Sequence, residues 1–307
     1  MVKVGIIGAD TPHAGELVRV LINHPETDLI SLYAPLLVGR NLSSHHHGLI
    51  GENPLKFTDK IQSEDLDLLI ITDKADLSDN LLSRFLNEEN MKAIAFKEDF
   101  LKDVEDKEVV EMGLSEINRK GLVRNARYAY IPSPSIIPAL VALSPLAYFL
   151  LLNSDINIEM EIPEEINKEI DIEKDKSKLD EELKKRQSSF NSAINLKTER
   201  DEQSERASLT TITMNSLLPL DELEKIYDQI YDDHNFVFLT RNELTTKEVE
   251  GTHKIFINLD KPDSETLVIK VVADSRLRGG AGDAVHILNL LFGLHEKTGL
   301  HLKPSRF

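Results

Sequence analysis

The chain of 307 residues contains no cysteine. This absence excludes disulfide bonds and thiolate metal sites, and it excludes covalent catalysis through a thiol. The chain also has no uninterrupted apolar run of about 18 residues or more, the length that a membrane-spanning helix needs. The longest apolar stretch, Ile136–Leu152, is broken by Pro138 and Pro145. It therefore predicts a buried helix followed by a turn.

The chain has fewer basic than acidic residues. Lys and Arg number 36 against 53 Asp and Glu, which leaves a net charge of −17. Nucleic acid is therefore a poor partner, because phosphate contacts need clustered cations. Free anionic substrates are repelled as well, unless a local basic site offsets the field. We interpret the acidity chiefly as a source of solubility.

The beginning of the chain carries no targeting signal of the secretory kind. Met1–Gly8 has the pattern of a strand that enters a turn, and not that of a signal peptide. Because no spanning segment is predicted either, we expect no membrane association and a cytoplasmic location.

The first half alternates strands and helices. Leu66–Thr72 is almost continuously apolar, as expected of a strand that is covered on both faces. Such a succession implies a parallel sheet, here in a doubly wound domain of the nucleotide-binding type. The predicted strands are Val2–Gly8, Leu29–Tyr33, Leu66–Thr72 and Lys92–Phe96, and the predicted helices are Gly15–Asn23 and Leu81–Asn87.

The second half has a different character. Glu159–Arg206 is dominated by charged residues, with Leu179, Leu183 and Phe190 at loose helical spacing. A solvated amphipathic helix and a disordered loop both account for this segment. Beyond it, alternating apolar residues indicate an antiparallel sheet with one wet face. The predicted strands are Ala207–Met214, Lys254–Leu259 and Thr266–Ala273, and the predicted helices are Leu220–His234 and Asp283–Phe292.

Together these elements predict an α/β protein of two domains. We assign residues 1–134 and 283–307 to a Rossmann-type parallel-sheet domain. Residues 135–282 are assigned to an α+β domain with a mainly antiparallel sheet, of the kind that serves oligomerisation or substrate binding.

Several separated segments carry a resemblance to a known family. In chain order they are Gly5–Ala9, Gly15–Leu17, Leu21–Pro25, Phe57–Asp59, Asp99–Phe100, Gly113–Arg119, Leu140–Leu146, Gly279–Gly282, Asn289–Leu294, Thr298–Leu300 and Lys303–Ser305. Each motif alone is weak, but their order along most of the chain is specific. The combination resembles the N-acetyl-gamma-glutamyl-phosphate reductases, the arginine-pathway members of the semialdehyde dehydrogenase family.

The resemblance implies a homo-oligomeric, two-domain fold with NADPH bound on the first domain. It also implies that an acyl phosphate is reduced through a thioester. That chemistry needs a thiolate that attacks the acyl carbon and then leaves, and a neighbouring histidine that handles the proton.

The resemblance places the catalytic turn at Ile131–Pro134. The cysteine position falls on Pro134, and Ser133 and Ser135 flank it. A serine would form an ester, and its alkoxide is hard to generate without a base and hard to expel. A catalytic hydroxyl at either serine and a proline-stiffened turn that begins a core helix are the two alternatives. Lys178 stands where the histidine is expected, in a charged segment that also fits a surface helix.

The cofactor turn departs from the family pattern as well. A dinucleotide turn needs glycines so that backbone amides can approach the pyrophosphate at a helix N-terminus. Here Thr11 replaces the middle glycine, and Asp10 adds a negative charge. An anion would therefore bind less closely. The candidate cofactor contacts in this turn are Gly8, Ala9, Asp10, Thr11 and His13.

The cation expected for an NADP 2′-phosphate is also missing. Ala34–Leu37 stands at its place, and Arg40 just beyond is the candidate substitute. Gly279 and Gly282 complete the candidate cofactor set, although close packing of a strand and a helix explains these glycines equally well. NADP binding is thus implied by the resemblance, and we expect it to be lost.

Three consecutive histidines, His45–His47, raise the question of a metal site. Adjacent imidazoles on one strand or helix cannot all reach the same ion, and no carboxylate completes the set. We therefore expect a solvated loop and no metal.

The nucleophile, the histidine and the 2′-phosphate clamp depart together, whereas packing motifs persist. The leading hypothesis is a non-catalytic or regulatory relative in arginine biosynthesis, as a homo-oligomer or as a hetero-oligomer with an active paralogue. The alternative is an NAD(P)H-dependent oxidoreductase for N-acetyl-gamma-glutamyl phosphate or a related carbonyl substrate, with Ser133, Ser135 or Lys178 recruited. A third class is a sensor that binds a phosphate or carboxylate at the helix after Gly8.

Overall fold

A computed structural model describes residues 1–61, 65–72, 85–86, 91–102, 104–201 and 204–304. Contacts between Cα atoms divide the chain into two compact units. The first unit comprises Met1–Pro132 and Gly279–His301, and the second comprises Ser133–Arg278 and the residues from Leu302 onward. These boundaries differ from the division drawn from the sequence at residues 133–134, 279–282 and 302–307.

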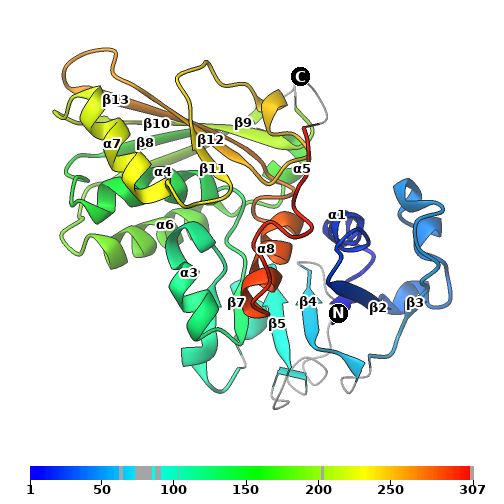
Figure 1. Cartoon of the computed structure of the whole chain (residues 1–307). Helices are drawn as coiled ribbons and strands as arrows, with labels where there is room; N and C mark the ends of the chain where they lie inside the picture. The colour runs from blue at the N-terminus through cyan, green and yellow to red at the C-terminus, as the bar shows by residue number, and fades with distance from the viewer. Residues whose placement is uncertain (62–64, 73–84, 87–90, 103, 202–203, 305–307) are drawn as a thin grey trace. The chain divides into compact units, whose positions relative to one another are not determined.

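The first unit is built on a seven-stranded parallel sheet in the order β3-β2-β1-β4-β5-β7-β6 (Figure 1). Its central strands β1, β4 and β5 are almost wholly buried, which explains their apolar sequences. Chain order reverses between β1 and β4, the switch point at which doubly wound folds bind ligands. The strands are β1 (Val2–Ile7), β2 (Thr27–Tyr33), β3 (Phe57–Thr58), β4 (Leu68–Ile71), β5 (Lys92–Ala95), β6 (Val110–Met112) and β7 (Tyr128–Tyr130).

One α-helix of the first unit packs against two others. The three helices are α1 (Pro12–Leu21), α3 (Ser115–Arg124) and α8 (Ala281–Leu291), with α8 in contact with both others. The side chain of His24, just after α1, bonds Asn289 of α8 at 2.9 Å. Short 3₁₀ helices lie at Pro35–Leu37 (η1), Leu42–Ser44 (η2), His47–Leu49 (η3), Glu98–Leu101 (η5) and Lys107–Val109 (η6).

The second unit is built on a six-stranded sheet in the order β11-β12-β13-β10-β8-β9. Its inner pairs are antiparallel, and the two marginal pairs, β11–β12 and β8–β9, are parallel. The strands are β8 (Ile156–Pro163), β9 (Ile194–Asp201), β10 (Ala207–Asn215), β11 (Val237–Leu239), β12 (Ile255–Asp260) and β13 (Thr266–Asp274). The helices are α4 (Ile137–Tyr148), α5 (Glu164–Asn167), α6 (Ile172–Arg186) and α7 (Leu220–Tyr231), with the 3₁₀ helix η7 at Thr246–Glu248.

Helix α4 forms the core of the second unit and contacts β10, β13, α6 and α7. Pro145 lies inside it and cannot donate to the carbonyl of Val141, four residues earlier. The hydroxyl of Tyr231, on α7, donates to that carbonyl at 2.5 Å. Tyr227, one turn earlier on α7, donates to the carbonyl of Ala142 at 2.6 Å. Helix α7 thus satisfies the group that the proline leaves without its helical partner.

The fold class predicted from the sequence is confirmed, with one parallel sheet and one mainly antiparallel sheet. The interpretation of Glu159–Arg206 as a helix or a disordered loop is wrong in part. Helix α6 is there, but β8 and β9 flank it. Buried Ile156, Ile158 and Met160 alternate with exposed, charged or amide neighbours in β8, so charge concealed the period of two. The predicted helix Leu81–Asn87 lies largely outside the described residues.

The apolar stretch Ile136–Leu152 forms α4 and the turn after it, as its prolines predict. In the part of the chain that the structure describes, no helix is both long and apolar enough to cross a membrane.

Candidate functional site

The turn after β1 is where a dinucleotide would approach the first unit. Gly8 has a φ of +74°, a left-handed conformation that favours glycine. The amides of Gly8 and Ala9 both donate to the carbonyl of Tyr33, at 3.1 and 3.0 Å. The turn is therefore closed by backbone bonds to the end of β2.

The N-terminus of α1 is largely satisfied by its own residues. An α-helix begins with four amides that have no helical partner, here those at residues 11–14. The Thr11 amide donates to Gly8 O at 3.1 Å, Pro12 has no amide hydrogen, and the Ala14 amide donates to Thr11 Oγ1 at 3.1 Å. Three of these four positions therefore offer no free amide hydrogen to a phosphate. The amides of Thr11 and Ala14 already donate within the protein, and Pro12 has no amide hydrogen.

Two of the three consecutive histidines cover the same turn. Nε2 of His45 lies 2.7 Å from the carbonyl of Asp10, and Nε2 of His46 lies 2.7 Å from that of Ala9. Burial lowers the pKa of His46. A β-carbon at Gly15 would lie 2.6 Å from its Nδ1, so that glycine lets the ring approach α1. The expectation of a solvated loop is wrong for His46, which is half-buried, whereas His45 is exposed.

The carboxyl edge of the sheet beside this turn is lined by further side chains. The ring of His13, in the first turn of α1, lies tilted against that of Phe96, just after β5, with 5.7 Å between the ring centroids. The hydroxyl of Thr72, just after β4, bonds the carbonyls of Ile7 and Gly8 at 3.1 and 3.0 Å. Arg40 is exposed in the loop beyond η1, where its carbonyl accepts from Phe57 N at 3.0 Å. In the described part of this edge, these side chains contact other groups of the protein.

Only Ser133 and Pro134 of the predicted catalytic turn belong to the second unit, where Ser133 and Ser135 converge on an acid that the sequence did not reveal. Ser133 Oγ donates to Asp175 Oδ2 at 2.8 Å, and Ser135 Oγ donates to the same oxygen. The two hydroxyls lie 2.9 Å apart. Ser133 is half-buried, whereas Ser135 is 1% exposed. Pro134 between them offers no nucleophilic atom.

Asp175 comes from α6, where it lies on the buried stripe with Leu179 and Leu183. Burial raises the pKa of its carboxyl, and the two serine hydroxyls act in the opposite direction. An acid four residues before a leucine of the apolar stripe is the signal that could have identified it. Lys178, one turn further on, pairs with Glu181 and Glu182 at 3.6 and 3.9 Å.

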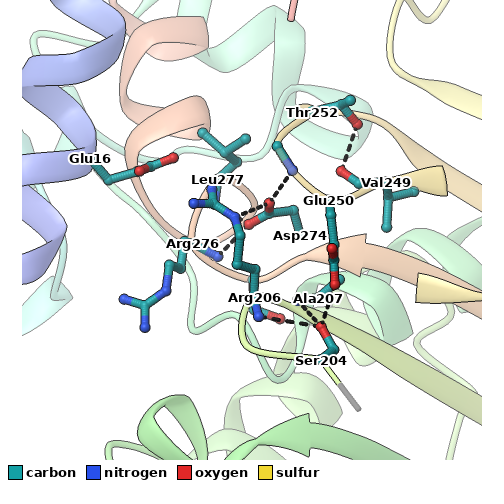
Figure 2. Close-up of polar contacts among 12 residues, drawn as sticks. Glu16, Ser204, Arg206, Ala207, Val249, Glu250, Thr252, Asp274, Arg276 and Leu277 are labelled. Carbon is teal, nitrogen blue, oxygen red and sulfur yellow. Dashed lines mark hydrogen bonds and ion pairs between the residues drawn. The ribbon is translucent and has the colours of Figure 1, made fainter. Parts of the chain in front are cut away.

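A second buried acid in this unit, Asp274, organises the end of β13 (Figure 2). Its Oδ2 accepts from Arg206 Nε at 2.8 Å and from the amide of Gly251 at 2.6 Å. Its Oδ1 accepts from the amides of Arg276 and Leu277 at 3.0 and 3.3 Å. The carboxylate of Asp274 thus holds Arg276 and Leu277, the residues that follow β13, in place.

The glycines that follow have a structural use in the first unit. Gly279 has a φ of +83°, and its amide donates to Asp283 Oδ2 at 2.6 Å. Gly282 is buried in the first turn of α8. Both serve the entry into this helix.

A polar network that sequence reasoning missed joins α3, α8 and the segment after α8. His286 is 3% exposed, with Nδ1 at 3.4 Å from Ser115 Oγ and Nε2 at 3.1 Å from Glu296 Oε2. Arg119 Nε donates to Glu296 Oε1 at 2.7 Å. Hydrogen bonds from His286 and Arg119 lower the pKa of Glu296 to about 2.

Comparison with curated proteins identifies close relatives along the whole chain. The N-acetyl-gamma-glutamyl-phosphate reductase of Parabacteroides distasonis is 34% identical, with 100% of each chain covered. The chain belongs to the N-acetyl-gamma-glutamyl-phosphate reductase family. Relatives of the same name from Christiangramia forsetii and Phocaeicola vulgatus are 32% and 31% identical, again with 100% of each chain covered. The family model of the semialdehyde dehydrogenase NAD-binding domain matches residues 3–124.

The fold of this chain is similar to the folds of solved aspartate semialdehyde dehydrogenases. Aspartate semialdehyde dehydrogenase II of Vibrio cholerae has a TM-score of 0.73 at 16% identity, with 95% of this chain and 98% of that chain covered. The aspartate semialdehyde dehydrogenase of Candida albicans, solved with NADP, has a TM-score of 0.68 at 12% identity, with 95% and 99% covered. At such identities the likeness concerns the fold alone.

Proposed function

We propose that this member of the family lacks the thioester reductase activity and serves arginine biosynthesis as a non-catalytic partner or regulatory relative. The single observation that carries the proposal is the absence of cysteine from the whole chain. A thiolate attacks an acyl phosphate and then leaves, and no other side chain combines both properties as well. The names of the relatives support a role in arginine biosynthesis. The residues of the predicted catalytic turn support the loss of reductase activity.

The contacts of that turn are those of a structural element. Both serine hydroxyls are used by one buried carboxylate, Asp175, and Pro134 stands between them. The purified chain should therefore oxidise no NADPH with N-acetyl-gamma-glutamyl phosphate. The Parabacteroides distasonis relative, assayed beside it, is the positive control. Turnover within a hundredfold of that control would contradict the proposal.

We also propose that NADP binding is lost. Asp10 places a carboxylate in the turn, and the amides of Gly8, Ala9, Thr11 and Ala14 already have acceptors within the protein. A pyrophosphate would have to displace these bonds before it could bind there. Titration of the chain with NADPH and with NADH, followed by cofactor fluorescence, should give no saturable signal at millimolar concentration. Saturable binding of either would refute this part.

The sheet of the second unit offers a surface for the partner. Helices α4, α6 and α7 pack on one face of it. On the other face Lys270, Thr211, Glu159 and Lys197 form one cross-strand row, and each is exposed or half-buried. Alternating charges of this kind are suited to a second copy or an active paralogue, because opposite charges can face one another across a two-fold axis.

The assembly can be tested in solution and in the native cell. Light scattering should give a mass above that of one chain, or co-purification should recover a paralogue. Lys270→Glu should weaken the assembly, and Lys225→Glu on α7 serves as the control. A lone monomer in both experiments would contradict the partner role.

A second candidate function is favoured by the geometry at Ser133. Its half-buried hydroxyl contacts Asp175, and the raised pKa of that carboxyl suits a proton donor, which would protonate the alkoxide formed by hydride transfer to a carbonyl. An NAD(P)H-dependent oxidoreductase for a carbonyl substrate would use this pair. It predicts cofactor binding and a reductase activity that Ser133→Ala abolishes. Failure of NADPH and NADH to bind removes this candidate and leaves the non-catalytic one.

A further inference from the structure

The outer edge of β9 is a long strand edge that no other strand of the described chain covers. Strand β9 pairs in parallel with β8 along its whole length, and β8 is its one strand partner there. Apart from the bonds to β8, the backbone of residues 194–200 forms no hydrogen bond with other described residues. A row of unpaired amides and carbonyls is a template for pairing with another chain.

The two margins of this sheet differ in how they are built. The opposite margin is β11, which is only three residues long. Strand β9 is eight residues long, contains no proline and runs beside β8 without a bulge. Native proteins shorten, bend or interrupt exposed edges, because long regular ones associate. The length and regularity of β9 therefore indicate an edge that is used for association.

The side chains of β9 are complementary to a second, antiparallel copy of the strand. They alternate between the face that α6 covers and the open face of the sheet, where Asn195, Lys197 and Glu199 are exposed. A two-fold axis at Thr198 sets Lys197 of each copy opposite Glu199 of the other, and it sets the two threonines opposite each other. Opposite charges and threonine pairs in such positions stabilise a sheet.

Neighbouring registers bring like charges together. An axis at Lys197 sets two ammonium groups opposite each other, and axes at Glu199 and Arg200 pair two carboxylates and two guanidinium groups. Like charges directly opposite destabilise strand pairing. Of these four successive positions, only Thr198 gives a favourable register, in which Leu196 also lies opposite the aliphatic stem of Arg200.

Glu199 also has an unfavourable neighbour within its own chain. The pairing of β8 with β9 sets Glu161 directly beside it, and both acids are exposed. Such like-charged neighbours repel each other. Among the described residues Glu199 has no partner in an ion pair. In the register centred on Thr198, Lys197 of the second copy lies on the other side of Glu199 and offsets this repulsion.

We propose that β9 pairs antiparallel with β9 of a second copy of this chain, about a two-fold axis at Thr198. The sheets of the two second units then form one continuous sheet, and the contact is closed because each copy uses the same edge. This contact goes beyond the partner role proposed above, which uses the open face of the sheet and does not choose between a second copy and a paralogue. It does not depend on the loss of reductase activity.

Disulfide cross-linking of the full chain tests the register, because a chain without cysteine accepts one cysteine at a time. In either type of antiparallel pair the Cα atoms of opposite residues lie about 4.5–5.5 Å apart, within the range that a disulfide spans. Under mild oxidation, Thr198→Cys should therefore form a covalent dimer about ten times as fast as Asn195→Cys. The two Asn195 positions lie about 20 Å apart in this register and serve as the matched control.

Charge exchange tests the pairing of the side chains. Lys197→Glu and Glu199→Lys should each raise the dissociation constant of the dimer about tenfold in analytical ultracentrifugation, because each sets two pairs of like charges opposite each other. The double exchange Lys197→Glu with Glu199→Lys should restore most of the affinity.

Three results would overturn the β9 contact. They are a monomer at all concentrations, equal cross-linking rates for Thr198→Cys and Asn195→Cys, and a double exchange that dissociates as readily as the single ones. An oligomer whose two cysteine variants cross-link equally fast would overturn this contact alone and leave the proposed partner role in place.

Discussion

Replacement of Glu296 by glutamine should make the stability of the first unit lose part of its dependence on pH. Glu296 accepts hydrogen bonds from His286 and Arg119, which tie the segment after α8 to α8 and α3. These bonds lower the pKa of its carboxyl from 4.5 to about 2. The ionised form is therefore more stable in the folded protein than in the unfolded chain.

The size of the effect follows from this shift. A difference of 2.5 units, 4.5 minus 2, corresponds to at most about 3.4 kcal/mol. Solvent access to the pair reduces the expected contribution to about 1–2 kcal/mol. Because the folded pKa is the lower one, the stabilisation is complete above about pH 4.5. It is lost as the pH falls toward 2, since the unfolded chain binds a proton that the folded protein does not.

Urea unfolding from pH 7 down to pH 3 measures this contribution. Glu296→Gln should lower the free energy of unfolding by about 1–2 kcal/mol at pH 7, and the difference should shrink toward pH 3. Glu52→Gln, at an exposed acid of the same unit, is the control. A difference for Glu296→Gln that is as large at pH 3 as at pH 7 would refute the linkage argument.

Three further predictions concern other contacts. Tyr231→Phe removes the hydroxyl that donates to the carbonyl of Val141, which Pro145 leaves without a helical partner. This substitution should lower the free energy of chemical unfolding by about 1–3 kcal/mol, and Tyr227→Phe should lower it by no more than about 1 kcal/mol. Asp274→Asn weakens a buried ion pair and should cost about 3 kcal/mol by the same measurement, and a cost below 1 would contradict its organising role. Gly15→Ala should stabilise α1 by about 1 kcal/mol, but only after His46→Ala has removed the imidazole ring that the new methyl group would meet. A double-mutant cycle that shows no coupling between the two substitutions would refute this clash.

The fold could be predicted from the sequence where the pattern was local. The continuous apolar run of Leu68–Ile71 is typical of a buried parallel strand, and the structure places it at the centre of the first sheet. Strand β8 was missed because Glu159 and Glu161, on the solvated face, raised the charge of its segment. The three-residue strands β6, β7 and β11 were missed as well, since so short a segment shows no period.

The candidate sites depended more on tertiary contacts. The sequence identified Ser133 and Ser135 as neighbours of the catalytic position, but their acceptor Asp175 is some forty residues away. Likewise the histidines at 45 and 46 were interpreted as a solvated loop, since nothing local places them against the carbonyls of Ala9 and Asp10. Separation along the chain hides a contact whenever neither partner belongs to a periodic pattern.

By itself the sequence determined which chemistry is absent, because a chain without cysteine has no thiolate in any conformation. It also determined the fold class, because hydrophobic periodicity is a local property. Only the tertiary structure decided how the remaining groups are used: which carboxylate the serines contact, and which rings cover the β1 turn. Such pairings depend on distances between elements far apart in the chain, and these distances are set by packing.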